Sequence, residues 1–420
     1  MTPTTTVRTE PEPAAVATPT VSNHMRRYLS RVRGGDLGAL PAVLGLIVLC
    51  TVFSIVRPAF LSAGNFANLF TQGAAVTVIA MGLVFVLLVG EIDLSAGFAS
   101  GVCAAVLANV ATLLGHPWYV AAGAAICTGV LIGFVLGFLV AKVGIPSFVV
   151  TLAAFLAFQG GMLILIKGGT NVSIHDEVLL AIANRNVPPA LGWLLAAVGV
   201  TGYAAVQLLR HRTRAVRGLT TDPLAVVFAR IVGLALVVGA AVYILNLERS
   251  RNPLIVSLKG MPIVVPVIAV LLVFWTFVLN RTAYGRHVYA VGGNREAARR
   301  AGINVDRIRI SAFVICSSMA AVGGIIAASR ATSVDANTGG SNVLLYAVGA
   351  AVIGGTSLFG GKGRVLDAVL GGAVVAVIDN GMGLMGYSSG VKFVLTGLVL
   401  LLAASVDALS RRRAAVTGSH

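Results

Sequence analysis

The stretch from Gly73 to Gly90 reads GAAVTVIAMGLVFVLLVG and contains no charged residue. A bilayer core about 30 Å thick needs about 20 apolar residues of helix, so this stretch is about long enough to cross a membrane. We predict about twelve such spans between Pro41 and Asp407. They lie near residues 40–56, 73–90, 97–114, 119–140, 148–166, 190–209, 224–245, 261–279, 309–329, 343–359, 366–385 and 391–408. Because the apolar runs are continuous and do not alternate with polar residues, they favour a helical bundle over a β-barrel.

The composition leads to the same fold class. Hydrophobic residues make up 57% of the 420 residues, charged residues make up 11%, and the mean hydropathy is +0.93. A water-soluble protein of this length needs a charged surface that this composition does not supply. We therefore expect an all-α, polytopic bundle of helices in the cell (cytoplasmic) membrane.

The formal net charge of +16 does not indicate a nucleic-acid partner. Proteins that bind DNA or RNA gather basic residues on one folded face, whereas the 31 Lys and Arg residues of this chain lie in short gaps between apolar runs. If the N-terminus is inside, most of them fall in the cytoplasmic gaps, as the positive-inside rule requires. This asymmetry predicts that both termini are cytoplasmic.

We divide the chain into a transmembrane domain over residues 37–410 and two tails. Residues 1–36 are rich in Thr, Pro, Ala and Glu, which predicts a disordered cytoplasmic tail rather than a cleavable signal peptide. Residues 411–420 form a second cytoplasmic tail. No soluble segment is large enough for a nucleotide-binding fold, and the scattered His and Cys residues give no support to a metal site.

The predicted cytoplasmic loop over residues 280–307 contains a short helix with marked ends. Asn294 is a good N-cap after Gly293, and Gly302 suits the left-handed position that ends a helix. Glu296 in the first turn and Arg299 in the last turn match the helix dipole.

The same short helix has a small apolar face made by Ala297, Ala298 and Ala301. A helix of this length is not stable alone, so it must pack on something. A partner's groove and a layer of lipid headgroups both suit an alanine face surrounded by Arg residues. The residues alone do not decide between these two alternatives.

Glu91, Asp93 and Ser95 follow the second predicted span. An unpaired carboxylate at the bilayer centre costs about 2.5–3.5 kcal/mol on insertion scales, although the cost is smaller near the boundary. One interpretation is structural: the carboxylates bridge helix ends and Ser95 caps the next helix. The other is a gate or a translocation path, in which the two carboxylates transmit a motor's stroke.

Asp379 and Asn380 lie within an otherwise apolar span, so this polar pair should face the interior of the bundle. An interhelical hydrogen bond, worth about 0.6 kcal/mol, explains the pair without any function. The alternative is a contact with a polar ligand that passes through the bundle.

The segment Glu296-Ala297-Ala298-x-x-x-Gly302 resembles the coupling loop of ATP-binding-cassette (ABC) importer permeases. The wider string Arg281-Thr-x-Tyr-Gly-Arg-x-x-Tyr-Ala-Val-Gly-Gly-Asn-x-Glu-Ala-Ala-Arg-x-x-Gly-Ile is similar to the permeases for ribose, xylose, arabinose and galactosides. The chain departs from the general importer pattern at Ile310-Ser-Ala-Phe, where Ile-x-Leu-Pro is expected, but the sugar branch commonly lacks that ending.

Further strings resemble the same sugar-permease family, and the likeness covers residues from about 60 to 405. They are Val89-Gly-Glu-Ile-Asp-Leu-Ser-Ala-Gly97, Gly144-Ile-Pro-Ser-Phe-Val-Val-Thr-Leu152 and Val352-Ile-Gly-Gly-Thr-Ser-Leu358. An extra pair of spans around residues 190–245, together with Ile378-Asp-Asn-Gly-Met-Gly-Leu-Met385, looks most like the xylose permeases.

The resemblance implies the permease subunit of an ABC importer for a monosaccharide, with D-xylose as the first choice, working as a homodimer. In that family the loop docks on a separate cytoplasmic ATPase, and an extracytoplasmic binding protein delivers the sugar. The residues that it assigns to ATPase coupling are Gly293, Asn294, Glu296, Ala297, Ala298, Arg299 and Gly302. The chain is then expected to bind no cofactor, to have no catalytic residue and to leave ATP hydrolysis to its partner.

Two other classes of function fit the sequence less well. An ion-coupled secondary sugar transporter needs membrane-embedded carboxylates or His relays, and only Asp379 is clearly interior. A membrane-embedded enzyme needs clustered catalytic side chains, which the sequence does not offer. Within the ABC class, an importer of ribose, arabinose or galactose is the alternative to xylose.

Overall fold

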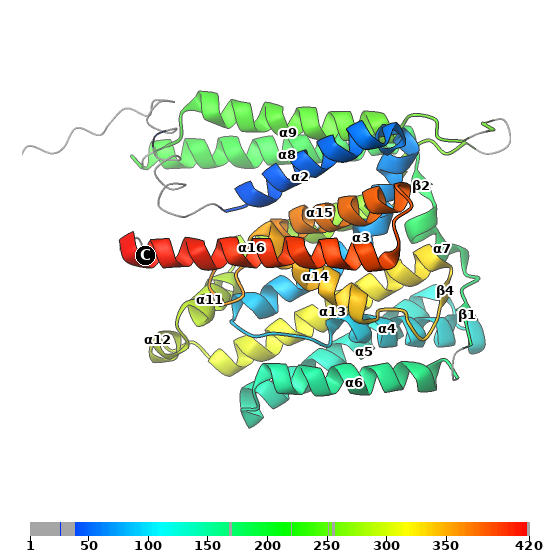
Figure 1. Ribbon diagram of the computed structural model, residues 1–420. Coiled ribbons are helices and arrows are strands. Elements are labelled where there is room, and N and C mark those ends of the chain that lie inside the picture. The colour runs from blue at the N-terminus through cyan, green and yellow to red at the C-terminus, as the bar shows by residue number, and fades with distance from the viewer. Residues whose placement is uncertain are drawn as a thin grey trace, which may run out of the picture.

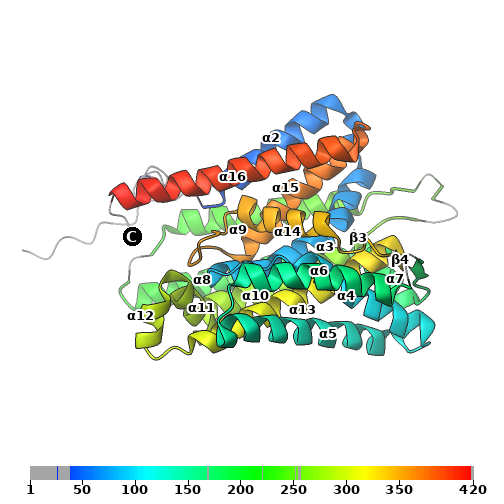
Figure 2. The same cartoon turned by 60° about the horizontal axis from the view of Figure 1, so that its bottom comes forward.

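The computed structural model is a bundle of roughly aligned helices, shown in two views in Figures 1 and 2. It describes residues 38–417, apart from 168–169, 220, 251 and 254–256, and also Arg26. The predicted tail over residues 1–36 lies, except for Arg26, outside the described residues. The all-α prediction is confirmed, since helices account for nearly all of the described secondary structure.

The helices follow one another along the chain with short connections. They are α2 Leu40–Val56, α3 Ala63–Leu88, α4 Ala96–Ala108, α5 Trp118–Phe138, α6 Ser147–Leu165, α7 Glu177–Asn184, α8 Pro189–Val216, α9 Leu224–Leu245, α10 Val264–Arg281, α11 Ala283–Gly293, α12 Arg295–Arg300, α13 Val305–Ala331, α14 Ser341–Gly354, α15 Val365–Leu384 and α16 Ser389–Thr417. Two π-helical segments, Asn109–Leu113 and Leu139–Val143, extend α4 and α5, and a 3-10 helix, Pro58–Leu61, precedes α3.

Each predicted span has a helix in the structure. In the described part of the chain, 9 helices are long and apolar enough to cross a membrane, and three shorter apolar helices occupy Leu40–Val56, Asn342–Gly354 and Ser389–Leu402. The C-terminal helix α16 continues past the predicted span to Thr417, through part of the segment that the sequence analysis treats as a tail.

One predicted span, near residues 343–359, is too long. Helix α14 ends at Gly354, because Gly355 takes a left-handed conformation with φ of 118°. The 14 residues of α14 rise about 21 Å at 1.5 Å per residue, which is less than the thickness of the bilayer core. The next ten residues, 355–364, form a loop that returns to the end of α3, where the Gly361 N–H donates to the Leu88 carbonyl at 2.9 Å.

The two ends of the bundle differ. Helices α11 and α12 lie at the same end as the start of α2 and the end of α16, whereas α7 and the short strands lie at the other end (Figure 1). The strands form two antiparallel pairs. β1 (Val172–Ser173) pairs with β4 (Ser333–Val334), and β2 (Asn186–Val187) pairs with β3 (Met261–Pro262). Both described ends of the chain thus lie on one side, and the sequence predicts that this side is cytoplasmic.

The core is built around α3, α13 and α15, while α8 and α9 lie side by side at one edge of the bundle (Figure 1). In α3 the side chains from Val78 to Leu88 are almost wholly buried, and in α8 and α9 most apolar side chains are exposed on the surface expected to face lipid. The extra pair of helices predicted around residues 190–245 is therefore peripheral to the core.

Helices α5 and α13 touch through a seam of small residues, Gly129, Gly133 and Gly137, spaced four apart on α5. A Cβ atom added at Gly133 would overlap the backbone of Phe313 and Val314. Without a hydrophobic driving force between helices in lipid, such close backbone approach supplies the packing energy. We call these three residues the glycine seam.

Replacing Gly133 with valine should lower the free energy of unfolding by about 1–3 kcal/mol, because the added side chain forces α5 and α13 apart. Thermal unfolding in detergent would measure this effect as a lower melting temperature. The matched control is Gly123→Val on the same helix, where a Cβ atom meets nothing within 4 Å. Equal melting temperatures for the two variants would contradict the role of the glycine seam.

Candidate functional site

The predicted short helix after residue 293 is present as α12. The Asn294 side chain accepts a hydrogen bond from the Ala297 N–H at 2.9 Å, and Gly302 has φ of 81°. Both predicted end signals are therefore confirmed. Gly293 is the last residue of α11. The preceding Gly292 lies against the end of α3, where an added Cβ atom would overlap the Leu88 carbonyl.

The alanine face of α12 is divided between the inside and the outside of the protein. Ala298 is only 4% exposed and packs into the hydrophobic core, whereas Ala297 and Ala301 are exposed. The expectation that all three alanines form one outward face is therefore wrong for Ala298. A helix of six residues is too short to be stable unless one side packs against the rest of the protein. Ala298 lies on that side. Glu296 and Arg299 are exposed and pair with each other at 3.2 Å.

Helix α11, which precedes α12, is hydrogen-bonded to α13 and to the loop after α14. The Tyr284 hydroxyl lies 2.9 Å from the Ser311 hydroxyl on α13, and the Tyr289 hydroxyl donates to the Gly363 carbonyl at 2.8 Å. Burial raises the pKa of Tyr284 to about 12, so this hydroxyl stays protonated at physiological pH.

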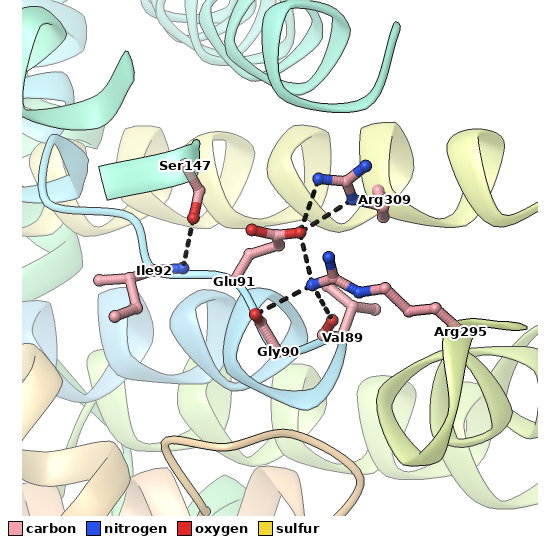
Figure 3. A network of polar contacts seen from close by, with 7 residues as sticks. All are labelled: Val89, Gly90, Glu91, Ile92, Ser147, Arg295 and Arg309. Atoms are coloured by element: carbon pink, nitrogen blue, oxygen red, sulfur yellow. Dashed lines mark hydrogen bonds and ion pairs between the residues drawn. The ribbon is translucent and has the colours of Figure 1, made fainter. Parts of the chain in front are cut away.

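Glu91 links α12 to the membrane-spanning core (Figure 3). Its Oε1 atom lies 2.6 Å from Arg295 Nη2, at the start of α12, and 2.8 Å from Arg309 Nη2, in α13. Arg295 also donates to the backbone carbonyls of Val89 and Gly90, at 3.1 and 3.0 Å. The side chain of Glu91 is only 6% exposed, and its carboxylate is paired with both guanidinium groups.

The sequence analysis missed Arg295 and Arg309. No local pattern marks either arginine, yet both form ion pairs with a predicted site residue. We call Glu91, Arg295 and Arg309 the arginine–glutamate clamp. The structural alternative for Glu91, in which it bridges helix ends, is realised in this geometry.

Asp93 belongs to a separate buried pair with Ser95. Asp93 Oδ1 accepts from the Ser95 N–H at 2.8 Å and from its hydroxyl at 2.6 Å, and both residues are at most 1% exposed. Ser95 occupies the N-cap position of α4 as predicted, but its side chain makes no capping hydrogen bond. Its hydroxyl donates to Asp93 Oδ1, and the same Asp93 oxygen accepts the Ser95 backbone N–H at the start of the helix.

The backbone between Asp93 and Glu91 is fixed by α6. The Ile92 N–H donates to the Ser147 hydroxyl at 3.3 Å, and the Thr151 hydroxyl lies 3.3 Å from the Ile92 carbonyl. Figure 3 shows the Ser147 contact beside the clamp. The connection from Val89 to Ser95 is thus tied to α6, α12 and α13 at once.

Asp379 and Asn380 form a second polar group with side chains of α3 and α16. Asn380 Nδ2 donates to Asn65 Oδ1 at 2.9 Å and to Gln72 Oε1 at 3.3 Å. Asp379 accepts from the Gln72 side chain and from Lys392 Nζ, the latter at 3.2 Å. The interhelical hydrogen bonds that explain this pair without any function are therefore present. We call these five residues the amide–carboxylate cluster.

The clamp and the cluster are two sites, not one. Both contact α3, but Gln72 and Leu88 are separated by about 24 Å of helix rise. The predicted gate residues therefore divide into the group at the end that carries α12 and the group nearer the opposite end. Among the described residues, no group of three or more His, Cys, Asp or Glu side chains is arranged to hold a metal ion.

The twelve apolar helices in the described part of the chain, the buried polar groups between them and the surface helix α12 define a multi-pass protein of the cell membrane. The chain belongs to the family described as branched-chain amino acid transport system / permease component, which matches residues 65–404. The family assignment covers the clamp, the cluster and α12.

The chain is similar to permease proteins named for xylose transport and ribose import. The chain is 37% identical over 355 residues to the xylose transport system permease protein XylH of Escherichia coli K12, covering 84% of this chain and 87% of the relative. It is 33% identical to the XylH of Haemophilus influenzae, covering 91% and 99%. It is 29% identical to the ribose import permease protein RbsC of Escherichia coli K12, covering 93% and 99%. No solved structure matches the chain.

Proposed function

We propose that this chain is the permease subunit of an ATP-driven ABC importer that carries D-xylose across the cell membrane. The similarity to xylose permeases over nearly the whole chain supports this function, and it is greater than the similarity to the ribose permease. The chain is not itself an enzyme. It binds no cofactor, a separate cytoplasmic ATPase hydrolyses the ATP, and an extracytoplasmic binding protein delivers the sugar to a dimer of this chain.

The observation that carries the proposal is the placement of α12. Its exposed side chains include Glu296, Ala297 and Arg299, and its first residue, Arg295, contacts the buried Glu91. A partner that docks on the exposed side thus reaches the membrane core through the Arg295 side chain, beside the buried Ala298. A helix that merely rested on lipid headgroups would have no need for a buried ionic connection to α3 and α13.

Movement of α12 passes to the core through the clamp. Arg295 holds the carbonyls at the end of α3 as well as Glu91, and Glu91 holds Arg309 on α13. Displacement of α12 by the ATPase therefore acts on the end of α3, on the connection to α4 and on α13 together. These three helices contact one another in the core.

The amide–carboxylate cluster suits the sugar path. Asp379 and Lys392 keep 28% and 21% of their side chains exposed. Charges at membrane depth are costly in lipid, so these two must face water or another protein surface. Amide and carboxylate groups also hydrogen-bond readily to the neutral hydroxyl groups of a sugar. We place the cluster on the translocation path, facing the second copy of the chain.

Asp379→Asn should lower the rate of xylose uptake at low substrate by about tenfold, because a hydrogen bond to a charged group is worth about 1.5–3 kcal/mol. Uptake of radiolabelled xylose by cells that carry the complete transporter would measure this. Asp222→Asn is the matched control, since Asp222 pairs with Arg230 outside the cluster. Full uptake by Asp379→Asn would remove the aspartate from the path.

Reconstitution tests the function as a whole. Vesicles that contain this chain, the ATPase and the binding protein should accumulate xylose only when ATP is supplied, and this chain alone should accumulate none. Accumulation by the lone chain on an imposed proton or sodium gradient would establish ion-coupled transport and refute the proposal. ATP-driven accumulation of ribose in preference to xylose would keep the class and change the sugar.

A further inference from the structure

A basic cavity lies between the ends of α8 and α10, away from the clamp and the cluster. It has a volume of about 550 Å³ and is lined by Val206, Leu209, Arg210, Thr213, Arg214, Asn280 and Arg281. The lining from α8 follows a helical stripe at spacings of three and four residues, so these side chains share one face of the helix. The lining from α10 is its last two residues.

The cavity holds positive charge without matching negative charge. Arg210, Arg214 and Arg281 converge on it, its lining contains no Asp or Glu, and none of the three makes an ion pair among the described residues. Thr213 and Asn280 add neutral hydrogen-bond donors. A ligand with several anionic oxygens would relieve the repulsion between the guanidinium groups and accept bidentate hydrogen bonds from them.

The position of the cavity identifies the source of that ligand. Helices α8 and α10 are both long and apolar enough to cross a membrane, and the cavity is lined by residues near their C-terminal ends. These ends lie at the end of the bundle that carries α11 and α12 (Figure 2). Val206 and Leu209 are the lining residues nearest the membrane-spanning part of α8. Two apolar residues next to three arginines fit a lipid, with its acyl chains against Val206 and Leu209 and its phosphate among the arginines.

We propose that this cavity binds the phosphate of an anionic phospholipid headgroup. The lipid joins the end of α8 to the junction of α10 and α11, and so it anchors the peripheral helices beside the loop that carries α12. General attraction of basic residues to a charged membrane does not explain the arrangement, because Arg212 and Arg217 lie at the same end of α8 and do not line the cavity.

The test compares two charge-matched double variants. Arg210→Gln with Arg281→Gln removes two lining charges, and Arg212→Gln with Arg217→Gln removes two charges at the same membrane level. Delipidated protein in detergent is titrated with phosphatidylglycerol and followed by native mass spectrometry. We expect the first pair to weaken binding by about tenfold and the second to change it little. Zwitterionic phosphatidylcholine should bind weakly to all forms.

Equal losses in the two double variants would overturn the proposal, since diffuse surface charge would then account for binding. Displacement of phosphatidylglycerol by inorganic phosphate would show that the site takes free phosphate, and would overturn the lipid assignment. If the first double variant fails to fold, the single variant Arg281→Gln serves in the same titration. It changes only the last, exposed residue of α10. Unchanged binding there would equally refute the proposal.

Discussion

Replacing Glu91 with glutamine should uncouple ATP hydrolysis from sugar uptake and should lower the free energy of unfolding by about 3–5 kcal/mol. The substitution removes the one negative charge that Arg295 and Arg309 share, and it leaves two guanidinium groups in a partly buried site. We expect uptake of xylose by reconstituted transporter to fall by more than tenfold, while the ATPase continues to hydrolyse ATP. The ratio of ATP hydrolysed to xylose transported measures the effect.

A second variant separates coupling from stability. In Glu91→Gln with Arg295→Gln, one of the unpaired guanidinium groups is removed as well, so melting temperature should recover in part. Transport should not recover, because α12 no longer holds the connection between α3 and α4. Normal transport by this double variant would show that the clamp stabilises the fold and plays no part in coupling.

Replacing Ala297 with tryptophan should abolish docking of the ATPase. Ala297 is exposed on α12, and a large side chain there blocks close approach of a partner without disturbing the buried Ala298 beneath it. Co-purification of the tagged permease with the ATPase should recover less than about a tenth of the wild-type amount of ATPase, a loss of at least about 1.4 kcal/mol of binding free energy. The melting temperature of the permease alone should be unchanged.

Ala283→Trp is the control for this docking experiment. Ala283 is also exposed, lies at the same end of the bundle and begins α11 rather than α12. We expect it to retain the ATPase. Retention of the ATPase by Ala297→Trp would mean that the exposed side of α12 is not the docking surface, and would favour the lipid-headgroup alternative for this helix.

The parts of the structure that depend on local sequence could be predicted. The length and hydropathy of an apolar run predict a membrane helix. The ends of α12 are predicted by Asn294 and Gly302, whose effects are limited to a few neighbouring residues. The end of α14 was misplaced because uncharged residues continue past Gly355 and through Phe359, although the glycine pair at 354 and 355 already makes one uninterrupted helix difficult there.

Contacts between distant segments could not be predicted in the same way. Glu91 meets Arg295 and Arg309, which lie 204 and 218 residues away, and no local pattern relates them. The burial of Ala298 depends on how α12 is oriented against the rest of the protein, and the sequence of its six residues does not determine that orientation. Lys392 did give a signal that was overlooked: a lysine within an apolar span requires a partner, and the carboxylate of Asp379 is that partner.

The glycine seam determines which parts of the bundle travel as one body. Because α5 and α13 meet backbone to backbone at Gly129, Gly133 and Gly137, there is no layer of adaptable side chains between them to absorb a shift. Displacement of Arg309 should therefore move α5 together with α13. Any sliding needed to open a passage must then occur at other interfaces, and cross-links placed between α5 and α13 should leave the transport cycle intact.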